Sequence, residues 1–178
     1  KNNFKKAEQL CNKILNIDPN HFDTIFFLGS ISVQAKNYDT AKKFLNKAIQ
    51  IQPNHINAYF NLGILFKELR NFEKSISCYQ KAIEIQPNNA RSHNELGVVF
   101  KELREFQKSK NCFQKAIEID SNYVPAYINL GNILKELGDY KKAIINYQKA
   151  IQIQPNNLKP YLNLGILFED QGEIGKAI

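Results

Sequence analysis

The sequence contains no methionine and no tryptophan, and no apolar run approaches the roughly 20 residues that a membrane-spanning helix requires. Its first residues, KNNFKKAEQL, have no apolar core of the kind found in secretory signals. The three cysteines are odd in number and form no C-x-x-C pair, which argues against a disulfide framework or a zinc site. We therefore expect a cytoplasmic protein with no membrane association and no metal or other cofactor. Because even the first residue is not methionine, we also expect the chain to be an excerpt of a longer protein.

The net charge of +7 would suit binding to nucleic acid if the basic residues were clustered. They are instead spread along the chain at a regular spacing, as in the row Lys13, Lys47, Lys81, Lys115 and Lys149. Regularly recurring lysines are typical of solvated helix faces, so we expect no nucleic-acid partner.

The chain repeats itself. Residues 126–157, AYINLGNILKELGDYKKAIINYQKAIQIQPNN, align without a gap on residues 58–89, AYFNLGILFKELRNFEKSISCYQKAIEIQPNN. The L-G pair in both stretches recurs every 34 residues, with its glycine at Gly29, Gly63, Gly97, Gly131 and Gly165. This period divides the sequence into a half repeat (1–21), four complete repeats (22–55, 56–89, 90–123 and 124–157) and a truncated repeat (158–178), which we expect to form a single array.

Each repeat carries two helical patterns on either side of a short break. In residues 124–157, the apolar residues of the first half follow helical spacing from Tyr127 to Leu137, and Gly138 then favours the end of a helix. The second half has another apolar stripe, which ends before Pro155 because proline lacks an N–H and disfavours helix in the residue before it. A single hairpin of two such helices cannot bury both apolar faces. The sequence therefore predicts an all-α solenoid of stacked helix hairpins.

The recurring glycine predicts close packing. Inside a helix, glycine costs about 1 kcal/mol relative to alanine, so its return at one position suggests that a neighbouring helix passes too near for a Cβ atom. In the last complete repeat, Ala143 and Ala150 form a flat strip on the second helix, with Tyr147 filling the gap beside it. We expect truncation of this buried tyrosine to cost about 3–5 kcal/mol.

These features resemble the tetratricopeptide repeat (TPR) family. The resemblance rests on the 34-residue period, the L-G pair, the large apolar residue three places after the glycine, the alanines and the closing proline, and it covers essentially the whole chain. Small departures occur at Ser75 and Ser109, where other repeats have alanine. The resemblance implies a right-handed superhelix whose concave groove is lined by the first helix of each repeat. It also implies a non-catalytic protein–protein interaction module that binds an extended peptide or a partner helix.

Carried over from the family, the groove residues of this chain form a polar, an apolar and a charged group. A carboxamide offers both a donor and an acceptor, so asparagines can satisfy the backbone of an extended peptide without reading its sequence. In the charged group each lysine is followed by a glutamate, which favours peptides of mixed charge over polyanions. The predicted peptide-binding residues are Asn61, Asn129 and Asn163, then Phe60, Ile64, Ile128 and Ile166, and finally Lys67, Lys101 and Lys135.

Two groups of TPR proteins allow a sharper comparison. Chaperone adaptors grip a C-terminal carboxylate with Lys, Asn, Asn, Lys and Arg from three repeats. The nearest window of this chain lacks the leading lysine and the final arginine, so we expect no such clamp; it reads Asn94, Val98, Asn129, Lys159 and Asn163. The TPR arm of O-linked N-acetylglucosamine transferases is more similar, because its repeats also carry N-L-G and place asparagines along the groove. A substrate-recruiting arm of a glycosyltransferase is therefore an alternative function.

The residue types needed for catalysis do not come together in the sequence. There is no glycine-rich phosphate loop, no nucleophile beside a base and no carboxylate pair set apart by its context, so we expect no catalytic residues and no enzyme in this chain. His21 and His55 share one repeat position and are expected to face solvent. Cys78 and Cys112 share another, which suits packing as small apolar side chains.

The two ends suggest a third function. Terminal repeats of solenoids normally carry a polar outer face, and neither end of this sequence has one. We therefore expect apolar surface to be exposed at both ends, which would allow self-association. A scaffold that assembles end to end is the corresponding alternative.

Overall fold

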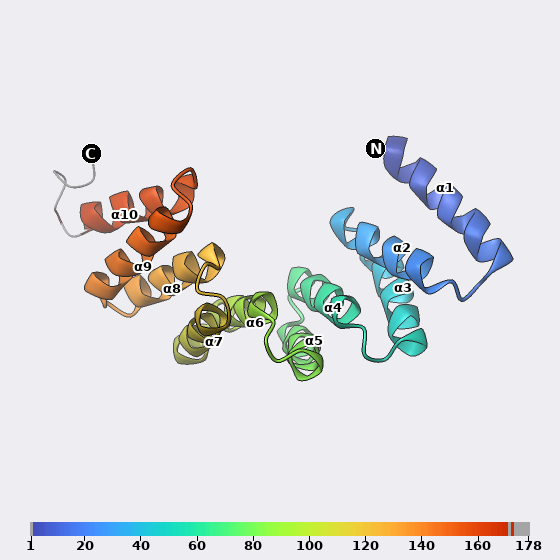
Figure 1. Ribbon diagram of the computed structural model, residues 1–178, viewed down its shortest axis with the longest axis horizontal. Coiled ribbons are helices and arrows are strands. Elements are labelled where there is room, and N and C mark those ends of the chain that lie inside the picture. The colour runs from blue at the N-terminus through green and yellow to red at the C-terminus, as the bar shows by residue number, and fades with distance from the viewer. Residues whose placement is uncertain (1, 171, 173–178) are drawn as a thin grey trace. The chain divides into compact units, whose positions relative to one another are not determined.

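The computed structural model describes residues 2–170 and residue 172. These residues form ten helices joined by short turns, with no strand among them, which confirms the all-α expectation (Figure 1). The helices are α1 (Asn2–Ile17), α2 (Phe22–Gln34), α3 (Tyr38–Ile51), α4 (Ile56–Glu68), α5 (Phe72–Ile85), α6 (Ala90–Glu102), α7 (Phe106–Ile119), α8 (Val124–Glu136), α9 (Tyr140–Ile153) and α10 (Leu158–Asp170).

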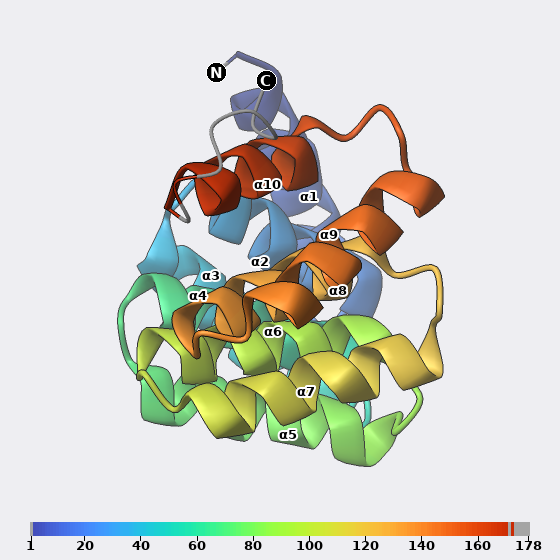
Figure 2. The ribbon, with the colours of Figure 1, turned by 90° about the vertical axis from the view of Figure 1, so that its left-hand side faces the viewer.

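The described residues up to Pro87 form one compact unit, and those from Asn88 onward form a second. In the first unit, α2 pairs with α3 and α4 pairs with α5, while in the second α6 pairs with α7 and α8 with α9 (Figure 2). Each pair is an antiparallel hairpin that corresponds to one repeat. We call its members the first and the second helix.

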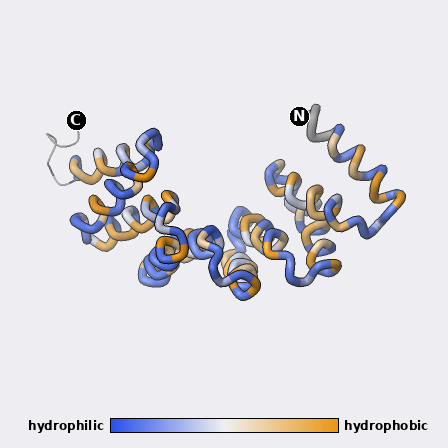
Figure 3. The backbone as a smooth tube through the Cα atoms, viewed as in Figure 1, coloured by the Kyte–Doolittle hydropathy of each residue, from blue (hydrophilic) through white to orange (hydrophobic). Residues whose placement is uncertain are grey.

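Apolar and polar residues alternate along the backbone of the described helices (Figure 3). In the second unit, the apolar faces of α8 and α9 form a core around Leu130, Ile133 and Tyr147. In the first unit, Ile25, Ala48 and Ala58 form a core. None of the described helices combines the length and the apolar character needed to cross a lipid bilayer.

In the four complete repeats, the glycine of the L-G pair is needed because a large side chain of the second helix lies against it. A Cβ atom built on Gly131 would lie 2.5 Å from Cε1 of Tyr147, and one on Gly63 would lie 2.6 Å from the same atom of Tyr79. Real Cβ atoms do not come so close to another carbon, so the predicted close approach is confirmed. Tyr147 is fully buried together with Ala143 and Ala150, as the sequence predicts.

The serines at the alanine position add a polar tie to this packing. The hydroxyl of Ser75 donates to the carbonyl oxygen of Gly63, and that of Ser109 donates to the carbonyl oxygen of Gly97, each over 2.8 Å. Both hydroxyls are buried, so these hydrogen bonds satisfy groups that would otherwise be desolvated without a partner.

The first helices end at a residue in the left-handed conformation. Gly138 takes this position with a φ of 78°, as expected for a glycine that stops a helix. The equivalent residues of the other hairpins are not glycine, yet they adopt the same conformation: Lys36 (φ 58°), Arg70 (φ 55°) and Arg104 (φ 60°). The following residue caps the second helix with its side chain in three of these four hairpins, as where Asp139 accepts a hydrogen bond from the backbone N–H of Lys142; Glu105, before α7, makes no such bond.

The second helices end at the same position whether or not proline follows. Before Pro155, α9 ends at Ile153 and Gln154 is extended, with φ −134° and ψ 82°. In α7 the proline is replaced by Ser121, but the helix still ends at the equivalent residue and Asp120 has φ −135° and ψ 99°. Proline therefore supports this turn but is not its cause, which corrects the sequence interpretation.

Candidate functional site

The predicted asparagines occupy one position on three first helices, and each is half-buried. We call Asn61, Asn129 and Asn163 the asparagine row. In every case the side-chain Nδ2 donates a hydrogen bond to a polar side chain on the preceding first helix of the same unit. The bonds run from Asn61 to Oγ of Ser30 (2.8 Å), from Asn129 to Oδ1 of Asn94 (2.9 Å) and from Asn163 to Oδ1 of Asn132 (2.9 Å).

Neighbouring contacts fix the orientation of two of these amides. The hydroxyl of Ser30 donates its proton to the carbonyl oxygen of Phe26 over 2.8 Å, so it accepts from Asn61. The amide nitrogen of Asn94 donates to Oε1 of Glu95 over 3.2 Å. Because a carboxylate only accepts, this contact turns Oδ1 of Asn94 toward Asn129.

The asparagine row thus presents acceptors more than donors. The sequence predicts that each carboxamide offers both a donor and an acceptor to a ligand, but one N–H of each is used inside the protein. The Oδ1 atoms of the row make no hydrogen bond with any residue that the structure describes. These oxygens can accept hydrogen bonds from the backbone N–H groups of an extended chain.

The apolar residues predicted for the groove divide into buried and accessible ones. Phe60 is only 4% exposed, with its ring packed edge to face against Tyr79 at 5.5 Å, and Ile128 is only 8% exposed. These two side chains contribute to the cores and do not offer an open pocket, which corrects the expectation for them. Ile64 is half-buried and Ile166 is 47% exposed, so they remain accessible.

The predicted lysines lie near the C-terminal ends of three first helices, and each is half-buried. Lys67 is on α4, Lys101 on α6 and Lys135 on α8. The ammonium group of Lys135 lies 3.0 Å from a carboxylate oxygen of Asp170 on α10. This ion pair links two successive first helices beside the asparagine row.

A pocket of about 380 Å³ lies in the second unit, beside Lys101 and Lys135. We call it the basic pocket, and its lining comprises Lys101, Arg104, Phe106, Asn132, Lys135 and Glu136. The guanidinium of Arg104 lies over the ring of Phe106, 6.0 Å from its centroid. A smaller hollow of about 50 Å³ adjoins it and is lined by Asn132, Lys135, Tyr147, Asn163 and Ile166.

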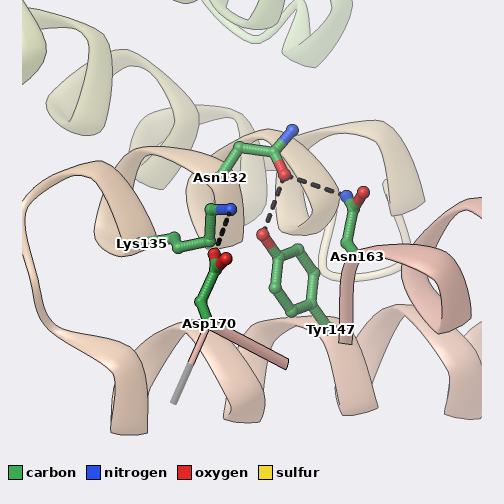
Figure 4. A network of polar contacts seen from close by, with 5 residues as sticks. All are labelled: Asn132, Lys135, Tyr147, Asn163 and Asp170. Atoms are coloured by element: carbon green, nitrogen blue, oxygen red, sulfur yellow. Dashed lines mark hydrogen bonds and ion pairs between the residues drawn. The ribbon is translucent and has the colours of Figure 1, made fainter. Parts of the chain in front are cut away.

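Asn132 connects the two spaces through a network of polar contacts (Figure 4). Its Oδ1 accepts hydrogen bonds from the Tyr147 hydroxyl over 2.8 Å and from the amide of Asn163 over 2.9 Å. Burial raises the pKa of Tyr147 to about 12, so the hydroxyl stays protonated near neutral pH. Three of the predicted residues, Lys135, Asn163 and Ile166, therefore meet around one polar centre.

Sequence reasoning misses Asn132 and Arg104 as members of the site. Asn132 stands where Ile64 and Val98 occupy the equivalent position of other repeats, so a polar residue in an apolar column is the signal that could have found it. Arg104 follows the end of α6 at the left-handed position, where only structure shows that its side chain turns back over Phe106. No pattern in the sequence indicates the pairing of Asp170.

His21 and His55 both cap helices; His21 is exposed as expected, whereas His55 is half-buried, which corrects the expectation for it. Nδ1 of His55 accepts a hydrogen bond from the backbone N–H of Ala58 at the start of α4, over 3.2 Å. Its ring also packs edge to face against Phe22 and Phe26. Burial lowers the pKa of His55, and the nearby charge of Asp23 opposes this effect. His21 caps α2 in the same way.

The cysteines have the environment of packing residues. Burial raises the pKa of both Cys78 and Cys112 to about 11, so their thiols are protonated and weakly nucleophilic near neutral pH. Among the described residues, no group of three or more histidine, cysteine or acidic side chains is placed to hold a metal ion.

Apolar side chains are exposed on both α1 and α10, as expected from the missing polar faces. Leu10 and Ile17 are exposed on α1, and Leu158, Tyr161 and Leu162 are exposed on α10. Whether these surfaces bind a second copy of the chain stays a prediction.

Family models cover most of the sequence. Models described as tetratricopeptide repeat match residues 22–55, 56–89, 90–123 and 112–145, and a model described as TPR repeat matches residues 131–172. These matches run without a gap from residue 22 to residue 172. A search of curated proteins finds no match.

Solved structures similar to this chain include MamA, with 25% identity, a TM-score of 0.74, and coverage of 84% of this chain and 88% of that one. The chain is also similar to pilF of Pseudomonas aeruginosa, with 20% identity, a TM-score of 0.85, and coverage of 99% and 80%. YrrB, described as a TPR protein with an unusual peptide-binding site, has 17% identity, a TM-score of 0.71, and coverage of 94% and 87%. At their identities, pilF and YrrB show similarity of fold alone.

Proposed function

Because the chain belongs to the tetratricopeptide repeat family, we propose that it is a non-catalytic protein–protein interaction module that binds an extended peptide along its first helices. YrrB, whose fold is similar, is described as having a peptide-binding site, which supports a peptide as the partner. The first helices α4, α6, α8 and α10 would each contribute a contact.

The observation that carries this proposal is the polarity of the asparagine row. Its Oδ1 atoms recur at one position on α4, α8 and α10, and one N–H group of each amide is bonded to the preceding first helix. A side chain held in this way loses little further conformational entropy when it accepts a hydrogen bond from a ligand. Ile64 and Ile166 would supply apolar contacts beside the row, and Lys67, Lys101 and Lys135 would contact polar or acidic parts of the peptide.

The experiment is to pan an unbiased peptide library against the immobilised chain and against the variant Asn61→Ala/Asn129→Ala/Asn163→Ala. Peptides enriched on the parent and lost on the variant would support recognition by the asparagine row. A matched control, Ser30→Ala/Asn94→Ala, removes two of the internal partners and so loosens the amides, but it keeps every Oδ1 atom of the row. We expect this control to retain the peptides with weaker binding. No enrichment on the parent would overturn the proposal.

The asparagine row also favours a second candidate function, the substrate-recruiting arm of a glycosyltransferase. Such an arm would use the same oxygens to hold protein substrates without reading their sequence. A sugar-nucleotide-binding domain encoded in the same gene would support this candidate, and a complete gene without one would exclude it.

The exposed apolar residues of α1 and α10 support a third candidate, a scaffold that assembles end to end. It predicts association that survives substitution of the asparagine row. Light scattering at high protein concentration tests it, since a strictly monomeric profile would refute self-association.

A further inference from the structure

The side chain of His55 contacts two successive first helices of the first unit. Nδ1 of His55, the residue before α4, accepts a hydrogen bond from the backbone N–H of Ala58 over 3.2 Å. Its ring also packs edge to face against two rings of α2, with centroid distances of 4.8 Å to Phe22 and 4.5 Å to Phe26. Both phenylalanines pack against the core that contains Ala58. One imidazole therefore connects the start of α4 to α2, and we call these contacts the α2–α4 joint.

The same part of α2 carries the hydrogen-bond partner of Asn61. The Ser30 hydroxyl donates to the carbonyl oxygen of Phe26 over 2.8 Å, and its Oγ accepts from Nδ2 of Asn61 over 2.8 Å. His55 and Asn61 thus contact α2 one helical turn apart. A movement of α4 away from α2 would break the bond between Ser30 and Asn61 and loosen an amide whose Oδ1 belongs to the asparagine row.

The bond to Ala58 requires a neutral imidazole. An acceptor nitrogen carries no proton, so the neutral ring of His55 holds its proton on Nε2. Protonation of Nδ1 would set two N–H groups against each other. It would also place a positive charge at the N-terminus of α4, where the helix dipole disfavours cations and the first turn holds no acidic residue. Protonation therefore drives the ring out of the α2–α4 joint.

The surrounding charges leave the neutral form favoured near neutral pH. Asp23 on α2 favours the charged ring, but burial outweighs it and lowers the pKa of His55 below its ordinary value of 6.5. Lys47 on α3 and Asp18 after α1 are each bonded to a backbone group of the turn between α1 and α2. The stabilisation supplied by the neutral ring is complete above pH 6.5, and it is lost as pH falls through the lower folded pKa.

The equivalent residues of other repeats lack this combination of contacts. His21 caps α2, but it is exposed and packs against no aromatic ring within the described part of the chain. In the second unit the position belongs to Tyr123, whose side chain makes no capping hydrogen bond before α8. Burial raises the pKa of Tyr123 from 10, so this residue stays neutral in mildly acidic solution. The bond between Asn129 and Asn94 thus serves as an internal reference for that between Asn61 and Ser30.

We propose that His55 is a pH-sensitive switch for the partner-binding surface of the first unit. Its protonation opens the α2–α4 joint and frees the Asn61 amide, so an extended peptide is held near neutral pH and released in mildly acidic solution. His55 acts by positioning Asn61 and touches no ligand itself. The release of a peptide rests on the proposed function, whereas the switch can be tested on the chain alone.

The test is a titration of the isotope-labelled chain by nuclear magnetic resonance from about pH 8 to about pH 5. We expect the Ala58 backbone amide and the Asn61 side-chain NH₂ signals to shift together with the His55 ring signals, at one midpoint below pH 6.5. Asp23→Asn should move this midpoint to lower pH, because it removes the charge that favours protonation. The Asn129 side-chain signals provide the reference.

Two matched substitutions assign the response to one ring. His55→Asn keeps a capping acceptor of the kind that Asn89 supplies before α6, but it cannot titrate in this range, so the response of Asn61 should vanish and that of Asn129 should not change. His21→Asn makes the same change one repeat earlier and should leave both responses as they are. A peptide selected by panning should bind the parent about fivefold more weakly near pH 5 than near pH 7, and His55→Asn should abolish this difference.

The outcomes separate the switch from the proposed function. An Asn61 signal that does not follow the His55 ring, or that responds equally in His55→Asn, would overturn the switch. A change of the Asn129 response in His55→Asn as large as that of Asn61 would also overturn it, because the effect would then not be local. An equal loss of peptide affinity in the parent and in His55→Asn would overturn the regulation of binding. Failure of panning alongside a successful titration would overturn the proposed function and leave the switch standing.

Discussion

The contact between Gly131 and Tyr147 makes the substitution Gly131→Ala a direct test of the hairpin packing. A Cβ atom at this position would lie 2.5 Å from Cε1, 2.8 Å from Cδ1 and 3.0 Å from Cζ of the tyrosine ring. The ring cannot move aside easily, because Tyr147 is fully buried and its hydroxyl is bonded to Asn132 over 2.8 Å. The helices must therefore separate, or the ring must give up its hydrogen bond.

The magnitude follows from two opposing terms. Overpacking a buried site typically costs 1–3 kcal/mol, and we expect about 3 kcal/mol here because the ring is tethered. Replacing a mid-helix glycine by alanine gains about 1 kcal/mol from helix propensity. The free energy of unfolding should thus fall by about 2 kcal/mol.

Gly29→Ala is the matched comparison in the first unit. Its Cβ would lie 2.8 Å from Cγ and 3.2 Å from the backbone nitrogen of Leu45, an aliphatic residue whose side chain has no polar tether and can shift more easily than the tyrosine ring. The overpacking cost should be closer to the lower end of the range, so the gain in propensity offsets most of it and the loss stays below about 1 kcal/mol.

Equilibrium urea unfolding followed by circular dichroism measures both variants, and hydrogen exchange of the α8 and α9 amides locates the effect of Gly131→Ala. In the double variant Gly131→Ala/Tyr147→Leu, which imitates the Gly29 and Leu45 pair, the cost of the alanine should largely disappear. A Gly131→Ala chain as stable as the parent, or an unchanged cost in the double variant, would refute the steric argument.

Further predictions concern the helix ends, the buried serines and the titrating groups. Gly138→Ala should lower the free energy of unfolding by about 1 kcal/mol in urea titrations, because alanine is strained at a φ of 78°. Ser109→Ala should lower it by about 1 kcal/mol in the same assay, through loss of the hydrogen bond to the Gly97 carbonyl. The pKa of His55 is lowered from 6.5, so its cap contributes fully above pH 6.5 and is lost as pH falls through the lower folded value; His55→Asn should remove this part of the pH dependence of the urea midpoint. Cys112, with its pKa raised to about 11, should react with iodoacetamide far more slowly in the native chain than in urea at the same pH.

Sequence spacing was sufficient to predict the packing inside each hairpin. The glycine and the large residue that fills the space beside it are 16 positions apart in one repeat, as in Gly131 and Tyr147, so both can be read from one helical pattern. The helix breaks were predictable as well, but their chemistry was not. Arg70 gives no sign in the sequence that it will adopt the conformation of Gly138, because the turn imposes that backbone on whatever residue stands there.

The candidate site was only partly predictable, because its properties depend on partners in other repeats. The position of Asn61 could be read from the period, but the direction of its amide is set by Ser30, 31 residues earlier. Whether Phe60 or Ile64 reaches the surface depends on the rotation of α4 against α5, since both lie on the apolar side of the helix. Hydropathy does not separate two such neighbours.

The contact between the glycine and the large side chain beside it affects how a repeat chain of this kind can evolve. The glycine and the large side chain that contacts it lie within one 34-residue period. A duplication or a deletion of one period therefore adds or removes both residues together. The hydrogen bonds of the asparagine row differ in this respect, because the partner of Asn163 is Asn132, which lies in the preceding repeat. A newly duplicated repeat therefore keeps the packing inside its hairpin, but the polar partners of its asparagine in the neighbouring repeat must arise by separate substitutions. This difference accounts for the pattern in this chain. The residues that pack each hairpin are nearly the same in every repeat, whereas the residues that accept hydrogen bonds from the asparagine row differ: Ser30, Asn94 and Asn132.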